Sequence, residues 1–173
     1  VKNRCDQAKE ISLSVGGSRE GGKMHIPADS SSAAFFMVAA SIVPGSDLIL
    51  EHVGINPTRT GVISILRLMG GDIELFNERT VGGEPVADVR VRAAQLHGID
   101  IPQDQVPLAI DEFPVLFIAA TCAKGRTVLS GAEELRVKES DRIQVMADGL
   151  IALGVDARPT PDGIVIDGGA ING

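Results

Sequence analysis

An internal duplication is the feature of this sequence that most constrains its fold. The first copy runs over residues 23–91 and the second over 98–166. Gly45 lies 80 residues before Gly125, and Gly70 lies 84 residues before Gly154, so a four-residue insertion relates the two copies. Chance self-similarity is common in α/β chains, but both copies predict the same order of strand, helix, strand, helix, strand, strand. The predicted fold class is therefore α/β, with repeated βαβαββ units whose helices pack on small mixed sheets.

Helices are predicted where apolar residues recur at helical spacing. Three serines, Ser30, Ser31 and Ser32, are expected N-caps of a helix with the apolar stripe Ala33, Phe36, Met37 and Ala40. Pro57 is expected in the first turn of a helix that ends at Gly70. Another helix ends at Gly154 and carries the stripe Ile143, Met146, Ala147 and Leu150. Short β-rich segments predict strands at 48–50 and 163–166.

The duplication divides the chain into three predicted parts. Residues 1–22, which contain an alternating stretch at 11–15 and two Gly-Gly pairs, are expected to be the closing strands of a preceding repeat. Residues 23–96 and 97–173 are each expected to form one βαβαββ unit. The chain starts at Val1 instead of an initiator Met and stops at Gly173, so we expect a piece of a longer protein.

Composition argues against several classes of function. The net charge of −7 argues against nucleic-acid binding, although a few local cations can still build a pocket for small anions. Cys5 and Cys122 match no CxxC pattern and are expected to be inert thiols in the cytoplasm, and the three histidines form no metal motif. The longest apolar stretch, 115–123, is too short to cross a bilayer, so no membrane association is expected.

The densest polar cluster, residues 133–142, precedes the last predicted helix and runs into it. Lys138 and Arg142 share a face if the segment is helical, and Glu139 lies three residues before Arg142. Ser140 is an alternative N-cap. Because free N–H groups at a helix start favour anions, a carboxyl group beside two cations suits phosphate or carboxylate chemistry. The spacing alone fits a solvated helix start as well.

Asp111 precedes an apolar helix that carries Phe113, Leu116, Phe117 and Ala120. It can cap that helix, or act as a base if it faces a cavity. In the register of the duplication Ser31 takes the place of Asp111, and residues 56–61 take the place of the cationic cluster. The first copy thus repeats the scaffold with milder chemistry, which predicts a structural or peripheral role for it.

Four segments resemble, in order, motifs of the EPSP synthase (3-phosphoshikimate 1-carboxyvinyltransferase) family of enolpyruvyl transferases. Residues 136–142, Arg-Val-Lys-Glu-Ser-Asp-Arg, resemble its RVKE[ST]DR signature, the most specific of the four. Residues 29–36, 56–61 and 111–114 resemble its D-x-S-S-A-A-F-F, N-P-T-R-T-G and D-E-x-P segments. The resemblance implies six βαβαββ units in two domains, with this chain mostly in the C-terminal domain.

The resemblance further implies transfer of the enolpyruvyl group of phosphoenolpyruvate to the 5-hydroxyl of shikimate 3-phosphate, with release of phosphate and without an organic cofactor. This reaction belongs to the shikimate pathway to chorismate and the aromatic amino acids. Asp111 matches the carboxylate that contacts the 5-hydroxyl, a candidate base, and Lys138 matches a lysine close to both substrates. Glu139 matches the proposed acid for C3 of phosphoenolpyruvate, and Arg142 matches an arginine that binds this substrate. Glu134 falls where many members have Asn and is given no role.

By the same resemblance, the N-terminal domain and a downstream D-H-R segment, which complete the site, lie outside this chain, so we expect the chain alone to be inactive. Two alternatives remain. One is a UDP-N-acetylglucosamine enolpyruvyl transferase, against which the motif at 138–142 speaks, and the other is a non-catalytic folding module. Because both motifs mark helix starts of one unit, we predict that Asp111 lies within about 15 Å of Lys138 and Glu139.

Overall fold

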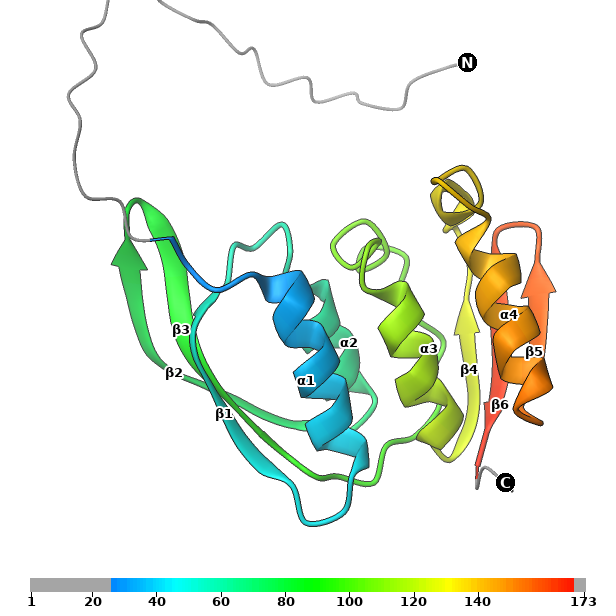
Figure 1. The fold of residues 1–173 in the computed structure, drawn as a ribbon, viewed down its shortest axis with the longest axis horizontal. Helices are drawn as coiled ribbons and strands as arrows, with labels where there is room; N and C mark the ends of the chain where they lie inside the picture. Colours follow the sequence, from blue (N-terminus) through cyan, green and yellow to red (C-terminus); the bar gives the residue numbers. More distant parts are fainter. Residues whose placement is uncertain (1–25, 170–173) are drawn as a thin grey trace, which may run out of the picture.

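The computed structural model describes residues 26–169 and shows two successive helix–sheet units (Figure 1). The first contains α1 (Ser30–Ile42), β1 (Asp47–Gly54), α2 (Gly61–Leu68), β2 (Asp72–Val81) and β3 (Glu84–Arg92). The second contains α3 (Phe113–Cys122), β4 (Gly125–Leu129), the 3-10 helix η1 (Glu133–Arg136), α4 (Arg142–Ala152), β5 (Asp156–Thr160) and β6 (Gly163–Gly168). This order confirms the repeated α/β fold. The strand predicted at 11–15 lies outside the described residues.

Each unit has a three-stranded antiparallel sheet whose last strand lies in the middle, in the orders β1-β3-β2 and β4-β6-β5. The first predicted strand of each unit is reduced to a parallel bridge, Ala28 with Val53 and Asp100 with Val128. Pro27 and Pro102 lie beside these bridges and cannot donate a backbone hydrogen bond, which explains the shortening. The two sheets are therefore antiparallel and not mixed as predicted, and parallel pairing is confined to isolated bridges outside them.

The glycines that set the register of the duplication have matching backbone conformations. Gly45 before β1 and Gly125 at the start of β4 have φ angles of 81° and 95°. Gly70 after α2 and Gly154 after α4 have φ angles of 89° and 82°. These angles fall in the left-handed region, where a side chain is strained, so the same turns require glycine in both units.

The helix starts differ from the predicted ones. Asp29, not a serine, is the N-cap of α1, and its carboxylate accepts hydrogen bonds from the N–H groups of Ser31 (3.4 Å) and Ser32 (2.9 Å). A carboxylate is favoured there because it also complements the positive end of the helix dipole. Pro57 lies in a turn outside α2, which begins at Gly61. The Gly61 N–H donates to the Leu108 carbonyl at 3.2 Å, so the approach of this second-unit loop fixes where α2 begins.

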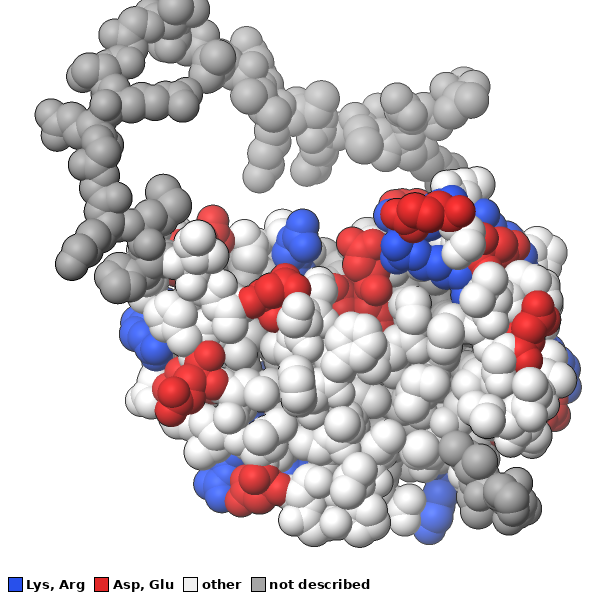
Figure 2. Space-filling view, in the orientation of Figure 1, with Lys and Arg blue, Asp and Glu red and all other residues white. Residues whose placement is uncertain are grey.

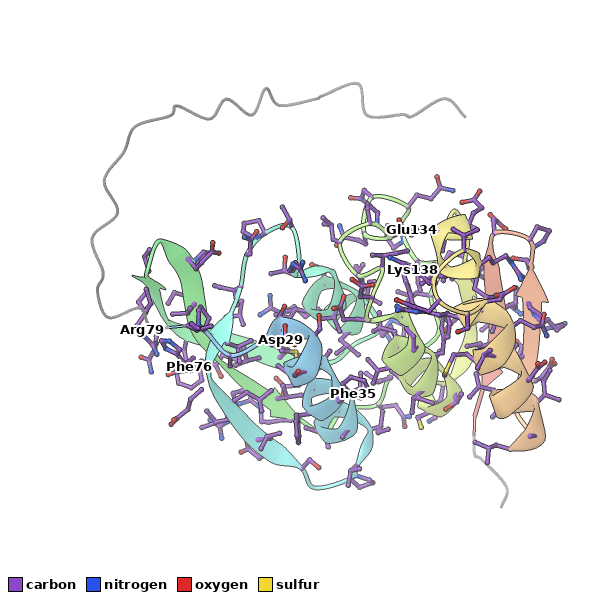
Figure 3. All side chains as sticks on the ribbon, turned by 45° about the horizontal axis from the view of Figure 1, so that its top comes forward. Asp29, Phe35, Phe76, Arg79, Glu134 and Lys138 are labelled. Atoms are coloured by element: carbon purple, nitrogen blue, oxygen red, sulfur yellow. The ribbon has the colours of Figure 1, made fainter. Side chains whose placement is uncertain are left out.

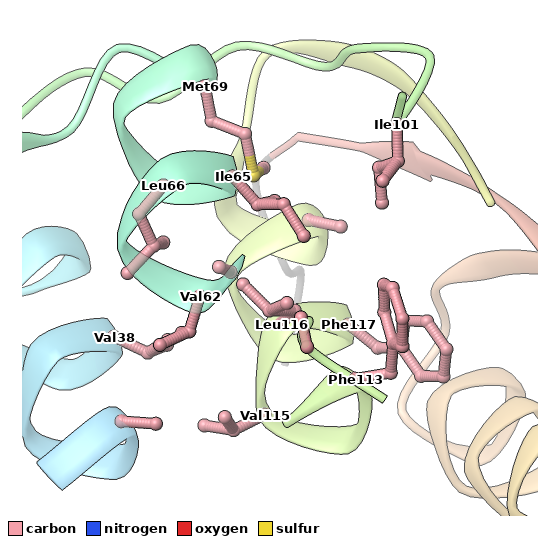
Figure 4. Close-up of a cluster of buried hydrophobic side chains, with 14 of the residues drawn as sticks. Val38, Val62, Ile65, Leu66, Met69, Ile101, Phe113, Val115, Leu116 and Phe117 are labelled. Atoms are coloured by element: carbon pink, nitrogen blue, oxygen red, sulfur yellow. The ribbon is translucent and has the colours of Figure 1, made fainter. Parts of the chain in front are cut away.

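The core lies where α1, α2 and α3 meet (Figure 4). Helices α1 and α3 pack side by side, and both are apolar around most of their circumference. Most of α3 is buried, whereas α1 leaves Phe35 and Phe36 exposed. Phe113 and Phe117 stack with their ring centroids 6.0 Å apart. No helix in the described part of the chain combines the length and apolar character that crossing a bilayer requires.

The exposed faces of the two sheets carry ion pairs of opposite arrangement. In the first sheet the central strand β3 supplies the cations: Arg90 pairs with Asp47 on β1, and Arg92 pairs with Asp72 on β2. In the second sheet the central strand β6 supplies the anion, Asp167, which pairs with arginines on both neighbouring strands, Arg126 and Arg158. In both arrangements, oppositely charged side chains on neighbouring strands pair with each other.

A matched pair of glycine substitutions tests the packing of the second sheet. A Cβ at Gly163 would lie 2.0 Å from the Leu129 carbonyl oxygen, whereas a Cβ at Gly149, on the exposed face of α4, would meet nothing within 4 Å. We expect Gly163→Ala to destabilise the chain by about 2–3 kcal/mol or more, because backbone must move. Gly149→Ala should stabilise it by about 0.5–1 kcal/mol. Equilibrium urea unfolding measures both, and equal effects would contradict the described close approach of β4 and β6.

Candidate active site

Asp111 lies in the turn directly before α3 but does not cap this helix. Glu112 occupies the N-cap position with helical backbone angles (φ −93°, ψ −5°), and its side chain makes no capping hydrogen bond. The Asp111 carboxylate is directed instead to the second half of its unit. Its Oδ1 lies 3.6 Å from Lys138 Nζ and 3.3 Å from an Arg142 guanidinium nitrogen. The predicted cap is therefore wrong.

Glu139 joins this cluster through Arg142, since its Oε2 accepts a hydrogen bond from the guanidinium at 2.9 Å. Asp111, Lys138, Glu139 and Arg142 thus form one contiguous group, which we call the charged cluster. The predicted convergence of Asp111 with this segment is confirmed, because Lys138 contacts Asp111 directly and Arg142 contacts both carboxylates. The shared cause is that α3 and α4 begin at the same edge of the second unit (Figure 1).

The two cations do not share a helical face. Lys138 lies in the bend after η1, and Arg142 is the first residue of α4. Between them Asp141, not Ser140, is the N-cap, and its carboxylate accepts from the Gln144 N–H at 2.9 Å. Arg142 therefore faces Asp111 from the first turn of the helix, while Lys138 reaches it from the preceding loop.

Arg136 holds this loop in place, a role that the sequence reasoning missed. Its guanidinium donates to the carbonyl groups of Thr160 and Pro161 in the β5–β6 turn and pairs with Asp141 at 2.6 Å. The loop that carries Lys138 and Glu139 is thereby anchored to the sheet on one side and to α4 on the other. One indication of this role was present in the sequence: Arg136 is the first residue of the segment that resembles RVKE[ST]DR.

Glu134, to which no role was given, contacts Lys138 with Oε1 2.7 Å from Nζ (Figure 3). This hydrogen bond, followed by attraction from Glu134 and Asp111, raises the pKa of Lys138, so the ammonium stays charged at neutral pH. Figure 2 shows acidic and basic side chains gathered at this edge, where α3 and α4 begin. The edge therefore carries fixed cations that are balanced by carboxylates.

The Glu139 carboxyl group is ionised in this arrangement. Its own backbone N–H and then the Arg142 guanidinium hydrogen-bond the carboxylate and lower its pKa. The side chain is 80% exposed, so it is free to turn toward a bound ligand. A role as a proton donor requires that a ligand first draws Arg142 away from it.

A polar cavity of about 210 Å³ adjoins Asp111. It lies between the two units, since Thr58 and Arg59 come from the first unit and the remaining lining residues come from the second, Pro107, Leu108, Ile110, Asp111 and Glu112. The segment at 56–61, predicted to be peripheral, thus borders the candidate site. Among residues 26–169 there is no group of three or more His, Cys, Asp or Glu side chains arranged to hold a metal ion.

Comparison with known proteins identifies the family. The sequence model of EPSP synthase (3-phosphoshikimate 1-carboxyvinyltransferase) matches residues 5–173, and the chain belongs to this family. It is 66% identical over 167 residues to the 3-phosphoshikimate 1-carboxyvinyltransferase of Nitrosococcus oceani and 67% identical over 163 residues to that of Methylococcus capsulatus.

The chain spans 38% and 37% of the length of these two relatives, which cover 96% and 94% of it. A solved EPSP synthase structure from Acinetobacter baumannii superposes with a TM-score of 0.86 at 64% identity. This superposition covers 88% of the chain and 35% of that structure.

Titration of Glu139 tests the described electrostatics. In Arg142→Ala the carboxylate loses the guanidinium, so its pKa should rise toward the ordinary value of about 4.3, while the bond from its own N–H keeps it from rising fully. Lys138→Ala, the control, removes only the smallest of the contributions and should raise the pKa less. Carbon-13 NMR of the side-chain carboxyl measures both, and an unchanged pKa in Arg142→Ala would refute the contact.

Proposed function

We propose that this chain forms part of the active site of an enzyme that transfers the enolpyruvyl group of phosphoenolpyruvate to the 5-hydroxyl of shikimate 3-phosphate and releases phosphate. The observation that carries the proposal is the charged cluster, in which the carboxylate of Asp111 lies between two cations at the start of two helices. Membership of the family, and the activity in its relatives' names, support this reading.

The charged cluster has the chemistry that the transfer needs. Lys138 and Arg142, whose side chains are 24% and 26% exposed, offer partly desolvated positive charge to the phosphate and carboxylate of phosphoenolpyruvate. An anion bound there competes with Asp111 for both cations. The freed carboxylate of Asp111 can then accept the proton of the attacking 5-hydroxyl as it adds to C2.

Glu139 completes the reaction as the donor of a proton to C3. The same bound anion draws Arg142 from Glu139 and adds negative charge nearby, and both changes raise the pKa of Glu139 toward its proton-carrying form. Addition of the hydroxyl to C2 and of the proton to C3 gives a tetrahedral intermediate. The bond from C2 to the phosphate oxygen then breaks and phosphate leaves, while C3 returns a proton to the Glu139 carboxylate and the C2–C3 double bond of the enolpyruvyl product forms. Substrate binding thus prepares the acid that the reaction uses.

The proposal includes the wider organisation inferred from the sequence. Residues 23–96 and 97–173 would be two units of the C-terminal domain, and residues 1–22 the end of a preceding unit. The rest of the enzyme, including its N-terminal domain, would supply the other contacts to shikimate 3-phosphate. Cys122 is a free thiol, which fits the reducing cytoplasm in which we place the enzyme.

We expect the isolated 173-residue chain to fold without turning over. The two units share one hydrophobic core, but the N-terminal domain, which by the family resemblance completes the site, lies outside this chain. Circular dichroism should report a cooperative unfolding transition, and assays with both substrates should detect no phosphate release. Measurable turnover by the pure chain would show that the site is complete without further residues.

In the full-length enzyme, Glu139→Gln should lower kcat by about 10²–10⁴-fold and change KM little, because glutamine keeps the shape but carries no proton to donate. Arg142→Ala should mainly raise KM for phosphoenolpyruvate, by roughly 10–100-fold, because the Arg142 guanidinium binds this substrate in both the ground state and the transition state. Glu133→Gln, an exposed carboxylate in the same segment, is the control. Steady-state kinetics decides, and near-normal kcat in Glu139→Gln would remove this residue from the mechanism.

A further inference from the structure

The hydroxyl of Ser31 in α1 donates a hydrogen bond to the carboxylate of Glu112 at the start of α3. Throughout residues 26–169, this is the one hydrogen bond or ion pair between side chains that joins the first unit to the second. The two helices it links are equivalent members of the duplication, and they pack side by side. The bond therefore fixes the seam between the units at the end where the charged cluster lies.

Glu112 is an unusual group to place in this seam. It is only 7% exposed, and within the described part of the chain no lysine or arginine lies within ion-pair distance of it. Burying a carboxylate without a cation costs stability, which a neutral residue of similar size would avoid. It makes no capping bond to α3 either. Neither helix capping nor core packing therefore explains why a carboxylate occupies this position.

Its position beside Asp111 supplies an explanation. The two carboxylates diverge from consecutive residues: Glu112 turns into the seam toward α1, and Asp111 turns toward Lys138 and Arg142. The backbone on both sides of Glu112 is held: its N–H donates to the Ala109 carbonyl at 3.0 Å, and its carbonyl accepts from the Leu116 N–H at 3.1 Å. Asp111 and Glu112 share one peptide unit, so a backbone movement that took Glu112 from Ser31 would also turn Asp111.

We propose that Glu112 is a positioning residue, which uses its bond to Ser31 to hold Asp111 in the direction of Lys138 and Arg142. The proposal rests on the proposed function, in which Asp111 receives the proton of the attacking hydroxyl. It assigns the first unit a definite part in the reaction, since the hydroxyl that orients the base comes from α1. The donor of this hydrogen bond is the neutral Ser31 hydroxyl, so the amide oxygen of a glutamine at position 112 can still accept it.

The test uses the full-length enzyme and the variants Ser31→Ala, Glu112→Ala, Glu112→Gln and the double alanine variant. Ser30→Ala is the matched control, because Ser30 lies in the same helical turn and its hydroxyl makes no hydrogen bond within the described residues. Two quantities are measured on folded enzyme. They are the steady-state constants with phosphoenolpyruvate and shikimate 3-phosphate, and the carbon-13 shift of the Asp111 carboxyl, assigned with Asp111→Asn.

We expect Ser31→Ala and Glu112→Ala each to lower kcat about tenfold with KM for both substrates within about twofold. The double variant should lose no more kcat than the single variant that is more impaired, because both changes break the same bond. Glu112→Gln should keep most of kcat. The Asp111 shift should move in Ser31→Ala, Glu112→Ala and their double variant, and stay unchanged in Glu112→Gln and Ser30→Ala.

Three results would overturn the proposal. They are an unmoved Asp111 shift, additive losses in the double variant, or a KM effect large enough to show that Glu112 contacts substrate. A wild-type enzyme that does not turn over these substrates, but whose Asp111 shift responds as expected, would refute the proposed function and leave the positioning of Asp111 supported.

Discussion

The packing of α1 against α3 is the contact on which the rest of the structure depends. Both helices are apolar on nearly all sides, so neither is stable at the surface of a single small sheet. Pairing them buries the side of α1 that faces α3, together with most of α3, and sets the units in a fixed relation. The pairing also brings the N-terminal ends of α1 and α3 to one edge, where the polar side chains at these ends become neighbours. The Ser31–Glu112 bond is a consequence of that apolar pairing, and it lies beside the charged cluster that the starts of α3 and α4 form.

Local sequence signals predicted the elements of the fold because those signals are also their physical causes. Gly70 and Gly154 mark helix ends since their left-handed backbone excludes a side chain, and they were readable without knowing any partner. Helix starts were less predictable. Serines, prolines and aspartates all favour a helix start, and which one is used depends on tertiary neighbours, as Gly61 shows through its contact with Leu108. The two starting strands were shortened by prolines whose effect depends on register.

The site was predictable in part for a similar reason. The convergence of Asp111 with Lys138 followed from element order alone, because helices of one unit begin at a common edge. The partners of Arg136 and Glu112 did not follow, since these contacts join residues about 25 and 81 positions apart and depend on how loops and units meet. The ion pairs on the sheets escaped prediction as well. Equivalent strands carry opposite charges, so the repeat preserves the pairing without preserving the residues that make it.

The central position of the last strand in each sheet has a consequence for how the chain acquires its structure during synthesis. Since β3 lies between β1 and β2, neither of the earlier strands has a partner until Glu84–Arg92 has emerged from the ribosome. The same holds for β4 and β5 until Gly163–Gly168 follows. Each unit must therefore form its sheet late and in one step, by closing contacts between distant residues. A nascent chain halted just before either closing strand would expose two unpaired strands and the apolar helices meant to cover them.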